Sequence, residues 1–371
     1  MISSLAVSAT WLVMWFLFLS FVNTGQKFYE HGWELILLEA GFLAIFLGGL
    51  NTRTSEILIW LFRWILFRMM LGSGLIKLHG DRAWKDLSAL KYHYETQPFP
   101  NPLSWYLDRL PEKILETGVL FSHFMLLVVP FLYFAPQPYA AFAGVLTVIY
   151  QVMIFAGGNY AWLNLVTAVL AFSTFSDGVL ISLTSGLVSQ SGLAAYPYGT
   201  APVILAGFIA LLSLPVLKNM FSEDQVQNRS FDCLHLVNSY GAFVEVPRER
   251  KEIVLECLEK KEPDESDWEE IRFHEKPDVP GERPRQVSPY LHRLDYPFWF
   301  TARNEEDIEW LESLLEKLLS GGKKVQRLFR EVPVEEPERV RARIFSYRFT
   351  SPSEKEETGN WWVREPEKIL L

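Results

Sequence analysis

The sequence predicts an α-helical multi-pass membrane bundle of five to seven spans, followed by a small soluble α+β domain. Residues 1–217 contain seven apolar runs but only 10 Lys+Arg and 11 Asp+Glu, whereas residues 218–371 contain 25 and 33. The second part therefore carries −8 of the net charge of −9. Such a contrast separates a membrane part from a soluble part. We expect a transmembrane domain at 1–217, with an interfacial or extended loop at 79–113, and a soluble domain at 218–371.

The apolar runs are long enough, or nearly so, to cross about 30 Å of hydrocarbon as helices. They lie at 6–22, 35–50, 57–78, 114–134, 139–155, 161–175 and 201–217. The runs at 35–50 and 161–175 are short, and apolar segments of this length also form re-entrant or interfacial helices. The sequence therefore predicts five spans and leaves these two open.

Four ionisable residues lie inside the apolar runs, namely Glu39, Arg63, Arg68 and His123. A charge in hydrocarbon is costly, so such residues are either paired or functional. Arg63 and Arg68 are five positions apart, about 140° around a helix, and cannot share one narrow face. We expect one of them to pair with Glu39 on a neighbouring helix, and we favour a structural over a functional role for all four.

The polar segment between the third and fourth runs is the most distinctive part of the chain. Gly80-Asp81 is expected to end the third helix, and Trp84, Leu87 and Leu90 recur at helical spacing, which predicts a short interfacial helix with Trp84 at headgroup depth. Further on, Pro98, Pro100 and Pro102 disfavour helix, so "YHYETQPFPNP" is predicted to be a stiff, extended rod.

An extended segment would place His93, Glu95 and Gln97 on one face. A histidine and a carboxylate are too few ligands for a metal, and no nucleophile with a base is indicated nearby. We therefore predict no catalytic residue, metal or cofactor, and favour a rigid lid over a catalytic face, while the catalytic alternative stays open.

The second part of the chain shows the patterns of a small α+β domain. "AFVEV" at 242–246 and the alternating 341–350 predict strands, and 259–270 is a charged run typical of a solvated loop. An amphipathic helix is predicted within 305–319, with apolar residues three and four apart, ended by Gly321-Gly322. A mixed aromatic and charged set either lines a groove or forms the core: Tyr290, His292, Arg293, Asp295, Trp299, Trp361 and Trp362.

Charge and cysteine content exclude some classes of partner and chemistry. An acidic second part argues against nucleic acid or anionic lipid as the main partner. Cys233 and Cys257 form either one disulfide or two free thiols. Because no CxxC motif is present, thioredoxin-type exchange is not expected.

Several segments resemble the lipase maturation factor family over nearly the whole chain. They are "WELILLEAGFLAIFLG", "GSGLIKLHGDRAWKDLSALKYHYETQPFPNPLSWY", "HLVNSYGAF", "SPYLHRLDYPFWF" and "NWWVRE". The resemblance implies a multi-pass protein of the endoplasmic reticulum membrane, or of the cytoplasmic membrane in a bacterial host, that helps secreted lipases to fold and assemble. It also implies a lumenal soluble domain, whereas Lys and Arg in the short loops weakly favour the cytoplasmic side.

Two hypotheses of function follow. The first is a non-enzymatic folding factor in the lipid bilayer with a secreted lipase as client; its partner-binding residues would be Tyr92, His93, Tyr94, Glu95, Gln97, Pro98, Asn101, Pro102, Tyr240, Gly241, Phe243, Tyr290, Arg293, Trp361 and Trp362. The alternative is a membrane-embedded enzyme acting on a lipid or a polypeptide. It requires Glu39, Arg63, His93 and Glu95 to converge on one cavity.

Overall fold

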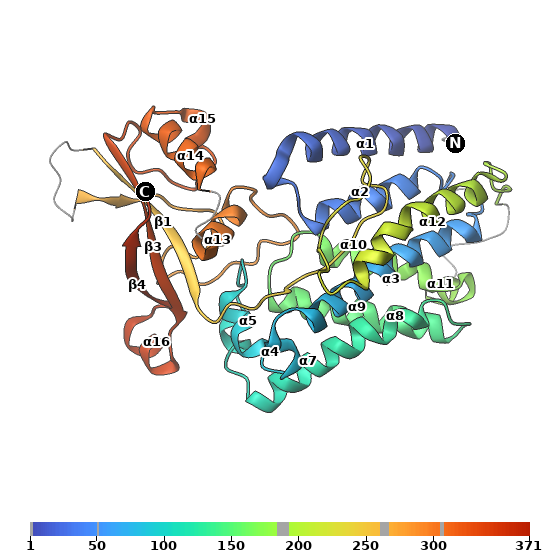
Figure 1. Ribbon diagram of the computed structural model, residues 1–371, viewed down its shortest axis with the longest axis horizontal. Helices are drawn as coiled ribbons and strands as arrows, with labels where there is room; N and C mark the ends of the chain where they lie inside the picture. The colour runs from blue at the N-terminus through green and yellow to red at the C-terminus, as the bar shows by residue number, and fades with distance from the viewer. Residues whose placement is uncertain (1–2, 50–51, 184–192, 260–266, 305–307) are drawn as a thin grey trace. The chain divides into compact units, whose positions relative to one another are not determined.

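Two compact units make up the chain, and each draws on separate stretches of sequence (Figure 1). The computed structural model describes residues 3–49, 52–183, 193–259, 267–304 and 308–371. Unit 1 comprises Met1–Ala89, Glu112–Phe155 and Trp162–Glu245, and unit 2 comprises Leu90–Pro111, Ala156–Ala161 and Val246–Leu371. The domain boundary predicted after residue 217 stays a prediction. The two units divide the chain differently, since 218–245 pack with the helices of unit 1 and 90–111 belong to unit 2.

Unit 1 is helical. Its elements are α1 (Ser4–Gly25), η1 (Gln26–Phe28), α2 (Gly32–Ala44), α3 (Glu56–His79), α4 (Arg82–Lys85), α7 (Glu112–Leu127), α8 (Val129–Leu132), α9 (Tyr139–Gly157), α10 (Leu163–Ala171), η2 (Phe172–Thr174), α11 (Asp177–Leu183) and α12 (Ala201–Met220). Within the described residues, five helical stretches are long and apolar enough to span a membrane, at Ser4–Phe28, Glu56–His79, Glu112–Leu132, Tyr139–Gly157 and Ala201–Met220. The helical multi-pass prediction is confirmed. The two runs left open form the shorter α2 and α10.

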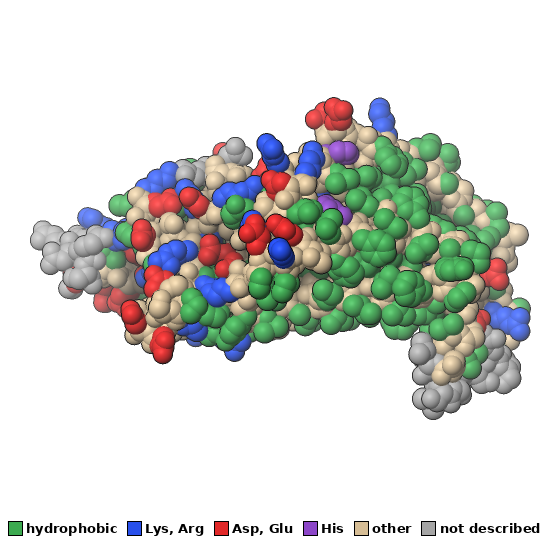
Figure 2. All heavy atoms as spheres, turned by 90° about the horizontal axis from the view of Figure 1, so that it is seen from below, with side chains coloured by type: hydrophobic (Ala, Val, Ile, Leu, Met, Phe, Trp, Pro, Cys, Tyr) green, Lys and Arg blue, Asp and Glu red, His purple; other side chains and the backbone are tan. Residues whose placement is uncertain are grey.

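Helix α3 is the central helix of unit 1 and contacts α2, α7, α10 and α12. Its apolar side chains, such as Leu58, Ile65 and Met70, are buried in the core of the bundle. The outer helices instead present apolar side chains outward, among them Phe16 of α1 and Phe142 of α9. Figure 2, which views the molecule from below, shows hydrophobic side chains covering much of the face that the helical unit presents in that view. An apolar exterior around satisfied helical backbone suits contact with lipid.

Unit 2 is built on an antiparallel sheet with strand order β2-β1-β3-β4. The strands are β1 (Arg250–Leu258), β2 (Glu269–Glu270), β3 (Arg339–Phe349) and β4 (Trp362–Ile369). Its helices are α5 (Leu90–Thr96), α6 (Ser104–Leu107), α13 (Asp295–Asn304), α14 (Glu309–Leu319), α15 (Lys323–Gln326) and α16 (Pro352–Thr358). β1 and β3 pair along their length, with Ile253 opposite Ile344. The predicted α+β fold, the strand near 341–350 and the amphipathic helix before Gly321-Gly322 are confirmed.

The prediction of an extended rod at residues 92–102 was wrong for its first half. Residues Leu90–Thr96 form helix α5. The steric effect of a proline acts on the residue before it, so Pro98 restricts Gln97 and leaves the preceding turn free to be helical. The helix accordingly ends at Thr96, and His93, Glu95 and Gln97 do not share one face.

Three smaller expectations were also corrected. The interfacial helix is reduced to α4, and Trp84 is buried beside Phe243 within unit 1 instead of lying at a surface. Residues 242–246 form no strand. Helix α13 was missed, because Pro297 suggests a break but falls in the first turn of a helix, where proline is tolerated. Of the charged run, 260–266 lie outside the described residues.

Candidate functional site

The polar side chains of residues 90–111 form a buried network within unit 2. Tyr160 donates a hydrogen bond to Gln97 Oε1 at 2.6 Å, and its hydroxyl lies 3.0 Å from His93 Nε2. Gln97 Nε2 in turn donates to the Ser104 hydroxyl at 3.1 Å and to the Gly157 carbonyl at 2.9 Å. His93 and Gln97 are therefore held between two stretches of chain and serve to fix their positions.

Asn101 and Asn159 extend this network. The side-chain amide of Asn101 donates to the Ala156 carbonyl at 2.8 Å, and its oxygen accepts from the backbone of residues 103 and 104. Asn159 Oδ1 accepts from the backbone amides of Val287 and Ser288 at 2.9 and 3.0 Å. Where irregular chain segments meet, the side chains of both asparagines thus supply the hydrogen bonds that buried backbone groups would otherwise make in a helix or sheet.

Arg250 joins the segment after α5 to the sheet. Its guanidinium donates to the carbonyls of Glu95, Gln97 and Pro98 at 2.8, 2.5 and 2.9 Å. It also pairs with the buried carboxylate of Glu252 at 2.5 Å, and Glu252 accepts from Lys276 Nζ at 2.9 Å. Arg250, Glu252 and Lys276 are all buried. Sequence analysis missed Arg250, because an arginine at the start of a strand is ordinarily exposed.

The other predicted residues of this segment contact the rest of unit 2 in different ways. Glu95 accepts from the backbone amide of Phe349 at 2.8 Å, and burial raises the pKa of its carboxyl. Tyr92 lies under the guanidinium of Arg248, 4.6 Å from the ring centroid, and burial raises the pKa of Tyr94. Pro98 is buried and Pro102 is half-buried. Most of these side chains face inward, and between Pro98 and Tyr106 only Leu103 and Tyr106 are exposed.

A second group of predicted residues, Tyr240, Gly241 and Phe243, belongs to unit 1. Tyr240 donates to Glu39 Oε2 at 2.7 Å, and Phe243 accepts from Trp84 Nε1 at 2.7 Å. A Cβ atom on Gly72 of α3 would lie 2.7 Å from the Tyr240 carbonyl oxygen, so the segment packs directly on the helix backbone. These residues connect 235–245 to the bundle.

The ionisable residues of the apolar runs have structural partners. Arg68 pairs with Glu39, as expected, and donates to the Asn238 carbonyl at 2.7 Å. Arg63 points elsewhere and donates to the carbonyls of Ser173 and Tyr133 at 2.7 and 3.1 Å. His123 Nε2 lies 2.9 Å from the Trp84 carbonyl oxygen.

Lys77 was missed by sequence analysis. It is buried at the end of α3, and its ammonium donates to the Ala242 carbonyl at 2.7 Å. A lysine near the end of an apolar run resembles one that reaches outward to the headgroups, so the sequence gave no reason to expect it inside. With Arg68 it gives α3 two buried cations, both bonded to carbonyls of residues 238–242.

The predicted residues of the second part differ in exposure. Trp362 is in the core, stacked on Phe349 at 4.2 Å between ring centroids. Trp361 is half-buried, Arg293 is also half-buried, and Tyr290 is 58% exposed. Trp105, one turn before Arg109, donates to the Thr350 carbonyl at 3.0 Å and contacts the edge of Trp361.

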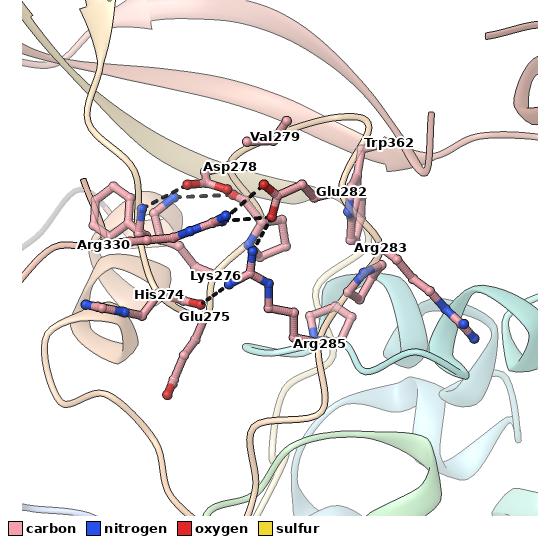
Figure 3. A pocket seen from close by; sticks show the side chains of 14 residues that line it. His274, Glu275, Lys276, Asp278, Val279, Glu282, Arg283, Arg285, Arg330 and Trp362 are labelled. Carbon is pink, nitrogen blue, oxygen red and sulfur yellow. Dashed lines mark hydrogen bonds and ion pairs between the residues drawn. The ribbon is translucent and has the colours of Figure 1, made fainter. Parts of the chain in front are cut away.

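A small polar cleft, open to solvent, lies beside this region and is lined mainly by 273–285 and Arg330 (Figure 3). Glu282 accepts from Arg285 at 2.5 Å and from Arg330 at 2.9 Å. Lys276 is neutralised by Glu252. Figure 3 shows Arg283 pointing away from these pairs. The acidic and basic groups of the cleft largely neutralise one another, and among the described residues no cluster of three or more His, Cys, Asp or Glu is placed to hold a metal ion.

Both cysteines are free thiols. Cys233 is exposed in unit 1, and Cys257 is buried in β1, where burial raises the pKa of its thiol to about 11. Thiol chemistry needs the thiolate, so Cys257 is unreactive.

Two family models match the chain. "Lipase maturation factor transmembrane domain" matches residues 1–182, and "Lipase maturation factor C-terminal domain" matches residues 236–370. The chain belongs to the lipase maturation factor family. It is 38% identical to Lipase maturation factor 1 of Bos taurus over 98% of this chain and 71% of the relative. Its identity to Lipase maturation factor 1 of Homo sapiens is also 38%, over 95% of this chain and 68% of the relative.

The family has a second branch to which the chain is less similar. Identity to Lipase maturation factor 2 of Homo sapiens is 26%, over 98% of this chain and 69% of the relative. No solved structure matches the chain. The resemblance noted in the sequence is confirmed, and it extends over both the helical and the sheet-containing units.

Proposed function

We propose that the chain is a membrane-anchored maturation factor that assists the folding and assembly of secreted lipases. The observation that carries this proposal is membership of the family at 38% identity over nearly the whole chain. In this function the five apolar spans hold the protein in the bilayer, and unit 2 contacts the client. The site of action is the endoplasmic reticulum membrane in a eukaryotic host, or the cytoplasmic membrane in a bacterial one.

Two exposed tyrosines and an exposed leucine of unit 2 support its role in contacting a client. Tyr106 is 49% exposed, Tyr290 is 58% exposed and Leu103 is 45% exposed. Aromatic residues contribute strongly to protein interfaces because they bury a large area at low cost in conformational entropy. The inward-facing residues, such as His93, Gln97 and Asn101, act indirectly by fixing the segment that presents Leu103 and Tyr106.

The enzyme hypothesis requires a convergence that neither unit contains. In unit 1, Glu39 pairs with Arg68, whereas Arg63 bonds to carbonyls near α8 and η2. In unit 2, His93 lies against Tyr160 and Glu95 against the amide of Phe349. Within each unit the two residues have different partners, so each is explained by local structure.

The proposal is tested in cells that lack their own lipase maturation factors and express a secreted homodimeric lipase. Expression of the chain should raise lipase activity per secreted lipase molecule, and Tyr106→Ala with Tyr290→Ala should lower that gain at equal protein level. Phe142→Ala, on the apolar exterior of unit 1, is the matched control and should retain the gain. Failure of the unmodified chain to raise specific activity, at normal membrane expression, would contradict the function.

The lumenal position of unit 2 has its own test. Protease added to intact microsomes should spare unit 2, and detergent should expose it to cleavage. Cleavage in intact microsomes would place unit 2 in the cytoplasm, in agreement with the loop charges and against the proposal.

A further inference from the structure

Next to the charge-neutralised cleft, unit 2 has a surface with two cations, Arg283 and Lys355, that pair with no carboxylate of the described residues. We call it the aromatic–cationic surface and define it by Leu103, Tyr106, Arg283, Lys355 and Trp361. Lys355 Nζ lies 3.0 Å from the centroid of the Trp361 ring, and the Arg283 guanidinium carbon lies 5.1 Å from it. Arg283 also lies 5.9 Å from the Tyr106 ring. The indole of Trp361 is thus in contact with two cations.

A third cation lies beneath this surface. The Arg109 guanidinium lies 3.9 Å from the centroid of Trp105, whose ring meets those of Tyr106 and Trp361 edge-on. Arg109 is held in place by the carbonyl of Trp105, at 2.6 Å, and that of Thr350, and it pairs with Asp108 at 3.4 Å. Partial burial lowers the pKa of Lys355, and the positive charges of Arg283 and Arg109 lower it further. Arg283 and Arg109 therefore repel Lys355.

Arg283 and Lys355 differ in one respect from Arg285 and Arg330 of the cleft. Arg285 and Arg330 share the carboxylate of Glu282. Within the described parts of the chain, Arg283 and Lys355 form no ion pair, and Arg283 donates only to the Pro102 carbonyl, at 2.8 Å. Unit 2 has 25 Lys+Arg and 31 Asp+Glu, so carboxylates are abundant, and the lack of one paired with Arg283 or Lys355 is a local property.

We propose that the aromatic–cationic surface binds an acidic, partly apolar segment of a polypeptide partner. A carboxylate between Arg283 and Lys355 would relieve their mutual repulsion and accept hydrogen bonds from the planar guanidinium. Apolar side chains next to that carboxylate would cover Leu103, Tyr106 and the exposed edge of Trp361. The net negative charge of unit 2 disfavours a broad anionic membrane surface and allows a short segment that reaches only the cationic spot.

Assigning this segment to the lipase client rests on the proposed function, whereas binding of the acidic segment does not. Acidic residues flanked by apolar ones are exposed on an incompletely folded chain and become covered or dispersed when it folds. A surface of this composition would distinguish an unassembled client from a mature one by the accessibility of such segments.

The test measures binding of a fluorescent peptide of alternating glutamate and leucine to the full chain in phosphatidylcholine nanodiscs. Arg283→Gln and Lys355→Gln should each raise its Kd roughly two- to tenfold, the range for a partly exposed ion pair. Arg285→Gln removes an exposed but already paired arginine from the same loop and should leave the Kd unchanged. A peptide of alternating glutamine and leucine should bind more weakly, and added salt should weaken the acidic peptide.

Several results would overturn the proposal. Equal affinity of all variants for the acidic peptide is one. A second is stronger association with vesicles containing phosphatidylserine than with the peptide, lost in Arg283→Gln, because it would identify a lipid headgroup site. Thermal unfolding of each variant confirms that binding is measured on folded protein. If lipase activity is rescued but the peptide result fails, this inference alone falls. If the peptide binds as expected and rescue fails, the proposed function falls instead.

Discussion

Replacing Arg250 with methionine should release the segment after α5 from the sheet of unit 2. The side chain is fully buried and bonds to three carbonyls and to Glu252. Each unsatisfied buried carbonyl costs about 1–3 kcal/mol, and removal of one partner from a buried charged network costs about 3–5 kcal/mol. Because these losses overlap, and because Lys276 still pairs with Glu252, we expect a total loss of about 3–5 kcal/mol in unit 2.

Hydrogen exchange measures this loss where it occurs. A loss of 3–5 kcal/mol raises the exchange rate of amides that open with unit 2 by roughly 10²- to 4 × 10³-fold. We expect that rise in peptides covering 90–98 and β1, with little change in α3. Arg250→Lys keeps a positive charge beside Glu252 but lacks the planar fork, so its effect should be intermediate. Arg330→Met removes an exposed ion pair and should cost less than about 1 kcal/mol. Unchanged exchange at 90–98 in Arg250→Met would refute this role of Arg250.

Three further predictions concern stability. Gly72→Ala places a Cβ atom 2.7 Å from the Tyr240 carbonyl oxygen and should destabilise unit 1 by about 1–3 kcal/mol. In the control Gly207→Ala, in α12, the added Cβ meets nothing within 4 Å, so this change should be neutral or stabilising by up to about 1 kcal/mol. Thermal unfolding in detergent compares the two variants. Tyr240→Phe removes the hydrogen bond to the buried Glu39 and should lower the free energy of unfolding by about 1.5–3 kcal/mol in the same assay. A loss no larger than that caused by removing a solvent-exposed tyrosine hydroxyl would contradict this prediction. Burial raises the pKa of Glu275 to about 8 and that of Asp295 to about 6, so the folded state holds these protons more tightly than the unfolded state. The protonated carboxyls contribute fully to stability below their ordinary pKa values, near pH 4. This contribution is lost as pH rises through about 6 for Asp295 and about 8 for Glu275, so the melting temperature of unit 2 should fall between about pH 4 and pH 8. Glu275→Gln should make this fall smaller.

Much of the fold follows from local patterns. Apolar length predicted the five spans, and alternation or helical spacing predicted β3 and α14, because these elements bury one face or an entire surface. Residues 90–102 were misjudged because the three prolines suggested an extended chain, although their steric effect begins only at Gln97. The contacts that set the conformation of this segment come from 156–161 and from β1, which no local pattern reveals.

The site was predictable in part. The aromatic and charged character of 90–106 and of 360–362 indicated a special region, and Trp361 does lie against Trp105. Residue type did not reveal which aromatic side chains are buried. Trp362 and Tyr240 are in the core, whereas Tyr106, also aromatic, is exposed. The sequence did not indicate a role for Arg283, Lys355 or Arg250. The role of a cation depends on which carboxylates lie near it in the fold, and this cannot be seen in the sequence.

The order of synthesis gives the interleaved arrangement of unit 2 a further consequence. Trp105 bonds to the carbonyl of Thr350, 245 positions later in the chain. At about 5–20 residues per second, a ribosome needs on the order of 10–50 s to make the intervening chain. For that time the buried hydrogen-bonding groups of 90–111 have no sheet to bind, although the helices on either side of them can already enter the membrane. A protein proposed to assist the folding of others thus has a slow step in its own folding. The yield of correctly folded protein should depend on what protects residues 90–111 until the last strands have been synthesised.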